Sequence, residues 1–186
     1  MTRIDCRAGV TDEQLRKLSA GDSVEITGDL VTVRDATAQK LTALLQAREP
    51  LPVNLKGQLL YAVGPSPPKP GQVVGSAGPT TTERLSAFLP SLFAAGARGI
   101  VGKGELHGSI ESAFREHGAV YFAAVGGLGA LLGKQVVATD VLAFPELGPE
   151  AVYGFRVEDF PAVVIIDLAG RNYHDLARAR WRRTTT

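Results

Sequence analysis

The sequence predicts an α/β domain whose strands and helices form three layers. Both ends of the chain are rich in strand-like segments, while strand-like and helix-like segments alternate in the middle. This mixed order favours three layers over a purely doubly wound sheet. The 186 residues, 45% of them hydrophobic and 21% charged, suit a globular fold with its own core. We therefore expect residues 1–186 to form a single domain, with mobile ends at 1–10 and 178–186.

The net charge and the distribution of apolar residues exclude several classes of protein. A net charge of +1 provides no overall field for a polyanionic partner, so nucleic acid is not expected to bind. The longest stretch without a charge, residues 118–133, contains five glycines and is shorter than the ~20 residues of a membrane span. The first residues have no apolar core of a signal peptide. The cytoplasm is the expected location.

The first third of the chain predicts a helix, a hairpin and a second helix. Thr11 and Gln14 have the spacing of a capping box, which marks a helix start. Residues 23–33 alternate apolar and polar side chains around a Gly-Asp pair, a pattern typical of a β-hairpin. The following helix is expected to begin with Asp35 as its N-cap and to stop before Pro50.

The middle of the chain predicts a strand, a loop and a long helix. Residues 58–64 form an apolar run typical of a buried strand. Residues 65–79 contain too much proline and glycine for regular structure, so they are expected to form an ordered loop or a lid. Residues 80–96 suit a helix with a break or kink at Pro90.

The remaining elements alternate until the C-terminus, where a short helix is expected from Asn172. Apolar runs indicate the strands and helical periodicity indicates the helices, and Pro161 is expected to divide the last two strands. The expected strands are 98–104, 119–125, 136–144, 151–160 and 162–168, and the expected helices are 109–118 and 126–134.

The stretch "GPTTTER" (78–84) is the first candidate site. Its hydroxyls and the free N–H groups of a helix start suit an anion, and Arg84 follows Thr80 by one helical turn. Thr80 and Glu83 also have the spacing of a capping box. An anion site and a simple helix cap therefore both remain open on the local pattern.

Two further basic residues stand where strands are expected to end. Lys103 lies between two glycines, at the carboxyl end of a strand, where open α/β sheets bind ligands. This is not a phosphate-binding P-loop, because Gly104 follows the lysine. Arg34 precedes Asp35 at a strand-to-helix junction, where a capped helix with a solvated arginine is the simpler interpretation. The acidic residues of 145–161 are interpreted as structural.

Metal ligands are not expected in this chain. It has one cysteine, Cys6, and three histidines in separate segments, His107, His117 and His174. None of these residues has the spacing of a metal site. An iron–sulfur cluster needs several thiolates, so this chain alone cannot hold one.

Five motifs together resemble a known family. Between about Leu18 and Tyr173 the chain reads "GDSVEITGDLVTVRDA", "YAVGPSPPKPGQVVGSAGPTT", "GARGIVGKG", "HGAVYFAAVGG" and "LGPEAVYGFRVEDFPAVVIIDLAGRNY". This order resembles the C-terminal domain of class I fumarases and the β subunit of two-chain fumarases and L-tartrate dehydratases. The resemblance implies a swivelling three-layer β/β/α domain. It also implies an iron–sulfur hydro-lyase that adds or removes water on a small dicarboxylate.

The resemblance also implies a division of labour. The cluster cysteines of this family belong to another domain or to the α subunit, which agrees with the lone cysteine here. This chain would be the β subunit of a hetero-oligomer, and the 4Fe–4S cluster would be carried by the α subunit. The β subunit would supply carboxylate-binding and proton-transfer groups. The expected catalytic residues are Thr80 and Lys103, and the expected substrate-binding residues are Arg34, Arg84, Thr81 and Asp35.

The chain departs from the family pattern at three positions. Ala38 stands where the family usually has a histidine, and Leu85 and Ser86 replace a Met-Asp pair. These changes leave the substrate open and suit a divergent dehydratase as well as a fumarase. A stand-alone dicarboxylate-binding or regulatory module with the same fold is the alternative hypothesis. An enzyme with cluster-free chemistry is a third.

Overall fold

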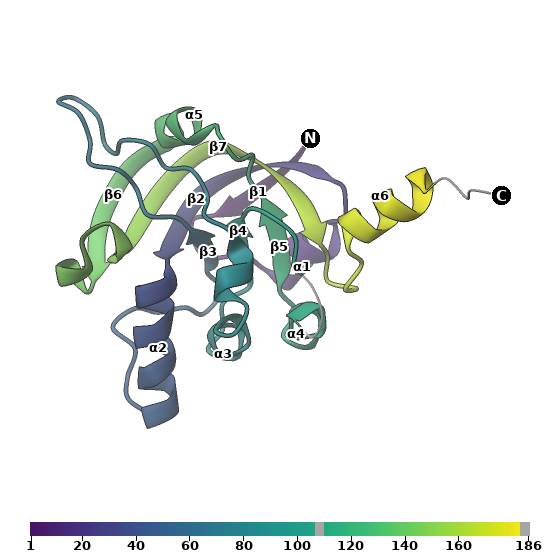
Figure 1. Cartoon of the computed structure of the whole chain (residues 1–186), viewed down its shortest axis with the longest axis horizontal. Coiled ribbons are helices and arrows are strands. Elements are labelled where there is room, and N and C mark those ends of the chain that lie inside the picture. Colours follow the sequence, from purple (N-terminus) through teal and green to yellow (C-terminus); the bar gives the residue numbers. More distant parts are fainter. Residues whose placement is uncertain (107–109, 183–186) are drawn as a thin grey trace.

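The computed structural model describes residues 1–106 and 110–182 (Figure 1). Within these ranges, strands and helices follow one another in a mixed α/β order. The strands are β1 (Thr2–Cys6), β2 (Ser23–Val33), β3 (Leu59–Ala62), β4 (Gly99–Gly102), β5 (Val120–Ala123), β6 (Val136–Ala143) and β7 (Val152–Ile166). The α-helices are α1 (Asp12–Arg16), α2 (Asp35–Ala47), α3 (Leu89–Ala94), α4 (Ile110–Glu116), α5 (Gly129–Lys134) and α6 (Tyr173–Trp181), and the 3₁₀ helices are η1 (Thr82–Leu85) and η2 (Pro145–Glu150).

The strands form one mixed sheet in the order β1-β2-β3-β4-β5-β7-β6. Strands β1 to β5 pair in parallel, whereas β7 is antiparallel to β2, β5 and β6. Because β7 pairs with both β2 and β5, the strands β2, β3, β4, β5 and β7 close into a ring. The mixed α/β class predicted from the sequence is confirmed.

Alternate residues of the strands face two hydrophobic cores. In β3, Leu59 and Tyr61 belong to the first core, and Leu60 and Ala62 belong to the second, as the two-residue period of a strand requires. The second core also contains apolar residues of α2, α3 and α4, which all lie on one side of the sheet (Figure 1). The long strands β2 and β7 are strongly curved and lie on the side of the molecule away from these helices (Figure 1).

Two predicted strand boundaries are wrong. The Gly28-Asp29 pair does not turn the chain, and β2 continues through it with a shift in its register against β7 between Ile26 and Gly28. Gly28 pairs with Cys6 of β1 on one side and with Val157 of β7 on the other. Likewise, β7 continues through Pro161, which lies opposite Glu25 of β2. In both places the pairing with neighbouring strands overrides a local turn signal.

The predicted long helix also differs from expectation. At the N-terminal end, residues 2–6 form β1, with Ile4 and Cys6 buried in the first core. The predicted helix 80–96 is two short helices, η1 and α3, and Pro90 lies in the first turn of α3, where its missing N–H costs nothing. At the other end, α6 includes residues 178–181, and residues 183–186 of the expected mobile tail lie outside the described residues.

Candidate functional site

The candidate site lies at the carboxyl ends of the parallel strands β2, β3 and β4. Arg34 follows β2 directly, Gly64 lies two residues beyond β3, and Lys103 follows β4. Parallel strands bring these ends to one edge of the sheet, which is where α/β folds bind ligands. The expectation that Arg34 and Lys103 stand at strand ends is confirmed.

The threonine segment is held between the ends of β3 and β4. The Thr80 N–H donates to the Ala62 carbonyl oxygen at 2.7 Å, and Thr81 forms a parallel bridge with Lys103. Thr80 and Thr81 are both half-buried. The fold therefore brings the predicted catalytic pair, Thr80 and Lys103, into neighbouring segments of chain that are 23 positions apart in sequence.

The predicted helix start at Thr80 is wrong. The N-cap of η1 is Thr81, and its side chain makes no capping hydrogen bond, so the expected Thr80–Glu83 capping box does not form. Thr80 precedes the helix, and the one-turn relation between Thr80 and Arg84 is lost. Arg84 instead reaches across to α2, where its Nε donates to Oδ1 of Asp35 at 3.0 Å.

Asp35 lies between two arginines. Its Oδ1 accepts the hydrogen bond from Arg84, and its Oδ2 is 3.9 Å from Arg34 Nε. Arg34 Nη2 is also 3.6 Å from Oε1 of Glu150. The N-cap of α2 is Arg34, with no side-chain capping bond, so Asp35 is the first residue of the helix and not its expected N-cap. The negative charge of Asp35 near the positive helix start is favourable.

Glu150 is a site residue that the sequence interpretation assigned a structural role. Its Oε2 accepts the backbone N–H of Ala36 at 2.9 Å, and its carbonyl oxygen accepts the hydroxyl of Thr37. Glu150 thus caps the start of α2 while its other carboxylate oxygen faces Arg34. No local pattern could have identified this role, because residues 36 and 150 are brought together only by the pairing of β2 with β7.

Close backbone approach fixes the position of the Arg34 guanidinium. A Cβ atom at Gly64 would lie 2.6 Å from Arg34 Nη1 and 3.0 Å from the carbonyl oxygen of Pro149, so a larger residue here would displace the guanidinium. The Arg34 side chain is only 23% exposed. Even so, its Nε and the Oδ2 of Asp35 are buried without a hydrogen-bond partner. Buried polar atoms normally have partners, and these two lie 3.9 Å apart as an ion pair that is too long for a hydrogen bond.

An open cavity of about 530 Å³ lies beside Lys103, which is the one residue of the six predicted for the site that lines it. Its lining includes Lys103, Gly64 and Pro149, so it lies between the lysine and the backbone that packs on Arg34. Gly126 also approaches the lysine, because a Cβ atom there would lie 3.5 Å from Lys103 Cδ. The volume is within the range of small-molecule sites. The lysine ammonium is the charged group among the lining residues.

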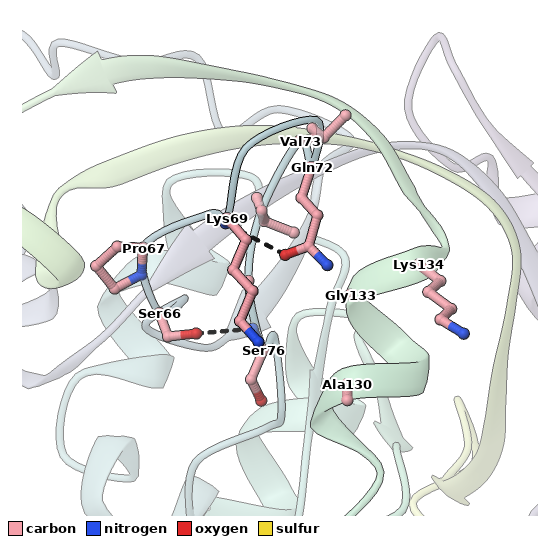
Figure 2. Close-up of a pocket in the computed structure, with 11 residues that line it drawn as sticks. Ser66, Pro67, Lys69, Gln72, Val73, Ser76, Ala130, Gly133 and Lys134 are labelled. Carbon is pink, nitrogen blue, oxygen red and sulfur yellow. Dashed lines mark hydrogen bonds between the residues drawn. The ribbon is translucent and has the colours of Figure 1, made fainter.

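The loop 65–79 forms one wall of the cavity and contains no helix or strand, as its proline and glycine content predicted. The Ser66 N–H donates to the Ser76 carbonyl oxygen at 2.9 Å, and the Ser76 N–H donates to Ser66 Oγ at 2.7 Å. A second cavity of about 410 Å³ lies between this loop and α5 and shares Ser66, Pro67 and Ser76 with the first (Figure 2). Figure 2 shows that Lys134 points away from it.

The three departures from the family pattern lie beneath the site. Ala38 and Leu85 are fully buried in the second core, and Ser86 is half-buried at the end of η1. Ala38 belongs to the helix that begins beside Arg34, and Leu85 is adjacent to Arg84. None of the three lines the cavity that contains Lys103.

The side chains of this chain do not fit an iron–sulfur cluster. Among residues 1–106 and 110–182, no three His, Cys, Asp or Glu side chains form a group able to hold a metal ion. The single cysteine, Cys6, is buried in β1, and a cluster needs several thiolates. In the same described ranges, no helix has the length and apolar character of a membrane span.

Cys6 is expected to be unreactive in the folded chain. Burial, followed by the nearby Asp29 and Asp5 carboxylates, raises the pKa of its thiol to about 12, so the reactive thiolate is scarce at neutral pH. Iodoacetamide at pH 8 should therefore leave the native chain unmodified and alkylate it fully in 6 M guanidinium. Mass spectrometry measures both results. Rapid alkylation of the native chain would contradict the buried position of Cys6.

Comparison with known proteins now places the chain in a family. Residues 1–177 match the family model described as the fumarase C-terminus, and the chain belongs to this family. Fumarate hydratase 2 of Leishmania major is 34% identical over 164 residues, which cover 87% of this chain and 29% of that protein. The anaerobic class I fumarate hydratase of Escherichia coli K12 is 33% identical over 162 residues, 86% of this chain and 30% of that protein.

A third relative has nearly the same length. A Methanocaldococcus jannaschii protein assigned as the β subunit of an L(+)-tartrate dehydratase is 34% identical over 172 residues, which cover 89% of this chain and 88% of that protein. The chain thus spans about 30% of the two fumarate hydratases and most of the tartrate dehydratase subunit. The predicted resemblance to this family is confirmed.

Proposed function

We propose that this chain is the β subunit of a heteromeric hydro-lyase that adds or removes water on a small dicarboxylate. The observation that carries the proposal is that Arg34 and Lys103 both follow parallel strands at one edge of the sheet, with Arg84 bonded to Asp35 next to Arg34. Three cations around strand ends suit a substrate with two carboxylates. The relationship to fumarate hydratases and to a tartrate dehydratase β subunit supports this substrate class.

The two arginines are proposed to bind the substrate carboxylates. A guanidinium is a planar donor that pairs with a carboxylate through two parallel hydrogen bonds. Arg84 uses its Nε for Asp35, and its side chain is 56% exposed, so its terminal N–H groups are free to bind. Asp35 and Glu150 carry negative charge and would repel a carboxylate. We therefore assign Asp35 a positioning role toward the arginines in place of the direct substrate contact expected from the sequence.

Lys103 and Thr80 are proposed to act on the reacting carbon. Removing a proton next to a carboxylate builds negative charge on that carboxylate, and a fixed ammonium stabilises this charge. The hydroxyl of Thr80 would move the proton at this carbon, with Thr81 contacting the substrate beside it. A threonine hydroxyl is a weak base, so Thr80 needs a neighbouring group that accepts its proton.

The 4Fe–4S cluster of the proposed enzyme belongs to a second chain. The side chains described here do not fit a cluster, so the α subunit would supply it, together with the Lewis acid chemistry that releases hydroxide. A hetero-oligomer follows from this division. The swivelling three-layer β/β/α arrangement is part of the same proposal. The two cores and the helices α2, α3 and α4 on one side of the sheet support it.

Reconstitution tests this proposal. The chain is mixed under argon with a cluster-bearing α subunit, iron and sulfide, and hydration of fumarate or dehydration of L-tartrate is followed by absorbance. Turnover is expected only when both chains are present. Binding of L-malate by the chain without turnover in any mixture would contradict the hydro-lyase and favour the stand-alone binding module. Turnover by the metal-stripped single chain would contradict the division of labour.

A further inference from the structure

The third threonine of the segment, Thr82, is buried directly against the backbone of Lys103. Its Oγ1 accepts the Lys103 N–H at 3.0 Å, and its own N–H donates to the Lys103 carbonyl oxygen at 3.0 Å. Both backbone polar groups of Lys103 are thus bonded to one residue. The Thr82 side chain is completely buried, so water cannot replace these bonds.

Tyr121 of β5 closes the same network from the other side. Its hydroxyl donates to the Gly104 carbonyl oxygen at 2.8 Å and lies 3.3 Å from Thr82 Oγ1. Burial raises the pKa of Tyr121 to about 12, so the hydroxyl keeps its proton across the physiological range. The tyrosine therefore holds the residue after Lys103 and orients the threonine that holds Lys103 itself.

The residue before Lys103 completes the arrangement. A Cβ atom on Gly102 would overlap Thr82 Oγ1, so glycine at the end of β4 leaves the space that the hydroxyl occupies. Lys103 stands between two glycines, and glycine has the least restricted backbone of all residues. The direction of the lysine side chain consequently depends on the contacts of Thr82 and Tyr121.

From this geometry we propose that Thr82, oriented by Tyr121, is a positioning residue that sets the direction of Lys103 at the substrate site. Thr82 also follows Thr80 and Thr81 directly in the chain. Its hydroxyl therefore fixes the position of the threonine segment relative to Lys103. The inference rests on the proposed function for the role of Lys103. The backbone contacts themselves are independent of it.

Amide hydrogen exchange of Lys103 tests the positioning without any substrate. Thr82→Val keeps the shape of the side chain and removes the acceptor, which leaves a buried N–H unpaired. Exchange at Lys103 should become about 10- to 100-fold faster, because its buried N–H loses its acceptor, and this increase should exceed the one at Ile100 in β4, which reports the loss of overall stability. Thr82→Ser should restore protection, and Tyr121→Phe should lower it partly. Unchanged exchange at Lys103 in Thr82→Val would overturn the proposal.

A double-mutant cycle on L-malate binding tests the effect on the site. Thr82→Val should weaken binding by about tenfold, and adding it to Lys103→Ala should cause no further loss, because residues that act through one contact are not additive. Thr139→Val removes a buried hydroxyl that has no hydrogen-bond partner and should leave the affinity unchanged. Additive losses would overturn the positioning role. If the wild-type chain does not bind L-malate, dicarboxylate binding fails, and the exchange experiment alone decides whether Thr82 positions Lys103.

Discussion

Replacing Arg34 with alanine is expected to remove most of the affinity of the chain for a dicarboxylate. Truncating one member of a largely buried charge pair costs ~2–5 kcal/mol, which corresponds to a loss of about 30-fold or more. The variant also leaves Asp35 and Glu150 facing each other without the cation between them. Titration calorimetry with L-malate measures the affinity, and circular dichroism checks that the variant is folded.

Two further variants make this experiment specific. Arg34→Lys keeps the charge but loses the planar fork, so an intermediate affinity is expected. Arg16→Ala removes an exposed arginine of α1 that pairs with Asp12 and should leave the affinity unchanged. Equal affinity of Arg34→Ala and the wild-type chain would show that Arg34 is not a carboxylate ligand.

Replacing Phe160 with alanine is expected to cause the largest loss of stability. Phe160 is fully buried in β7, and its ring meets Tyr61 edge to face with centroids 5.2 Å apart. It lies opposite Ile26 of β2, where the sheet closes on itself. Loss of a buried phenylalanine and the resulting cavity lower the free energy of unfolding by ~3–5 kcal/mol. Urea unfolding followed by circular dichroism measures the change.

A matched variant on the neighbouring strand controls this measurement. Val141 of β6 is half-exposed, and Val141→Ala should change the free energy of unfolding by only about 0.5 kcal/mol, as is usual for surface positions. If Phe160→Ala cost no more than Val141→Ala, the first core would not hold β2 and β7 together.

Some local sequence patterns predicted helix starts correctly, whereas the capping box expected before η1 did not form. The capping box of Thr11 and Gln14 forms as expected, and Asn172 caps α6. Caps and side-chain alternation depend on neighbours a few residues away, which the sequence contains directly. The hairpin at Gly28 and the division at Pro161 failed because long-range strand pairing supplied more hydrogen bonds than the local turns could.

The candidate site divides in the same way. Arg34 and Lys103 could be placed at strand ends, since strand ends are visible in the apolar runs before them. Glu150 could not be recognised, because its partner at the start of α2 is 114 positions away. Thr82 follows Thr80 and Thr81 in the sequence, but its proposed role in positioning Lys103 could not be predicted. That role depends on Tyr121, which is 39 positions further along.

The sequence by itself determined the mixed α/β class, the family and the basic residues at the strand ends. Only the tertiary structure decided that β2 and β7 close the sheet, that Asp35 and Glu150 hold the arginines, and that Thr82 holds Lys103. The physical reason is the range of the interactions. Helix caps and strand periodicity are local, whereas ion pairs and buried hydroxyl contacts form between residues that the chain brings together only when it folds.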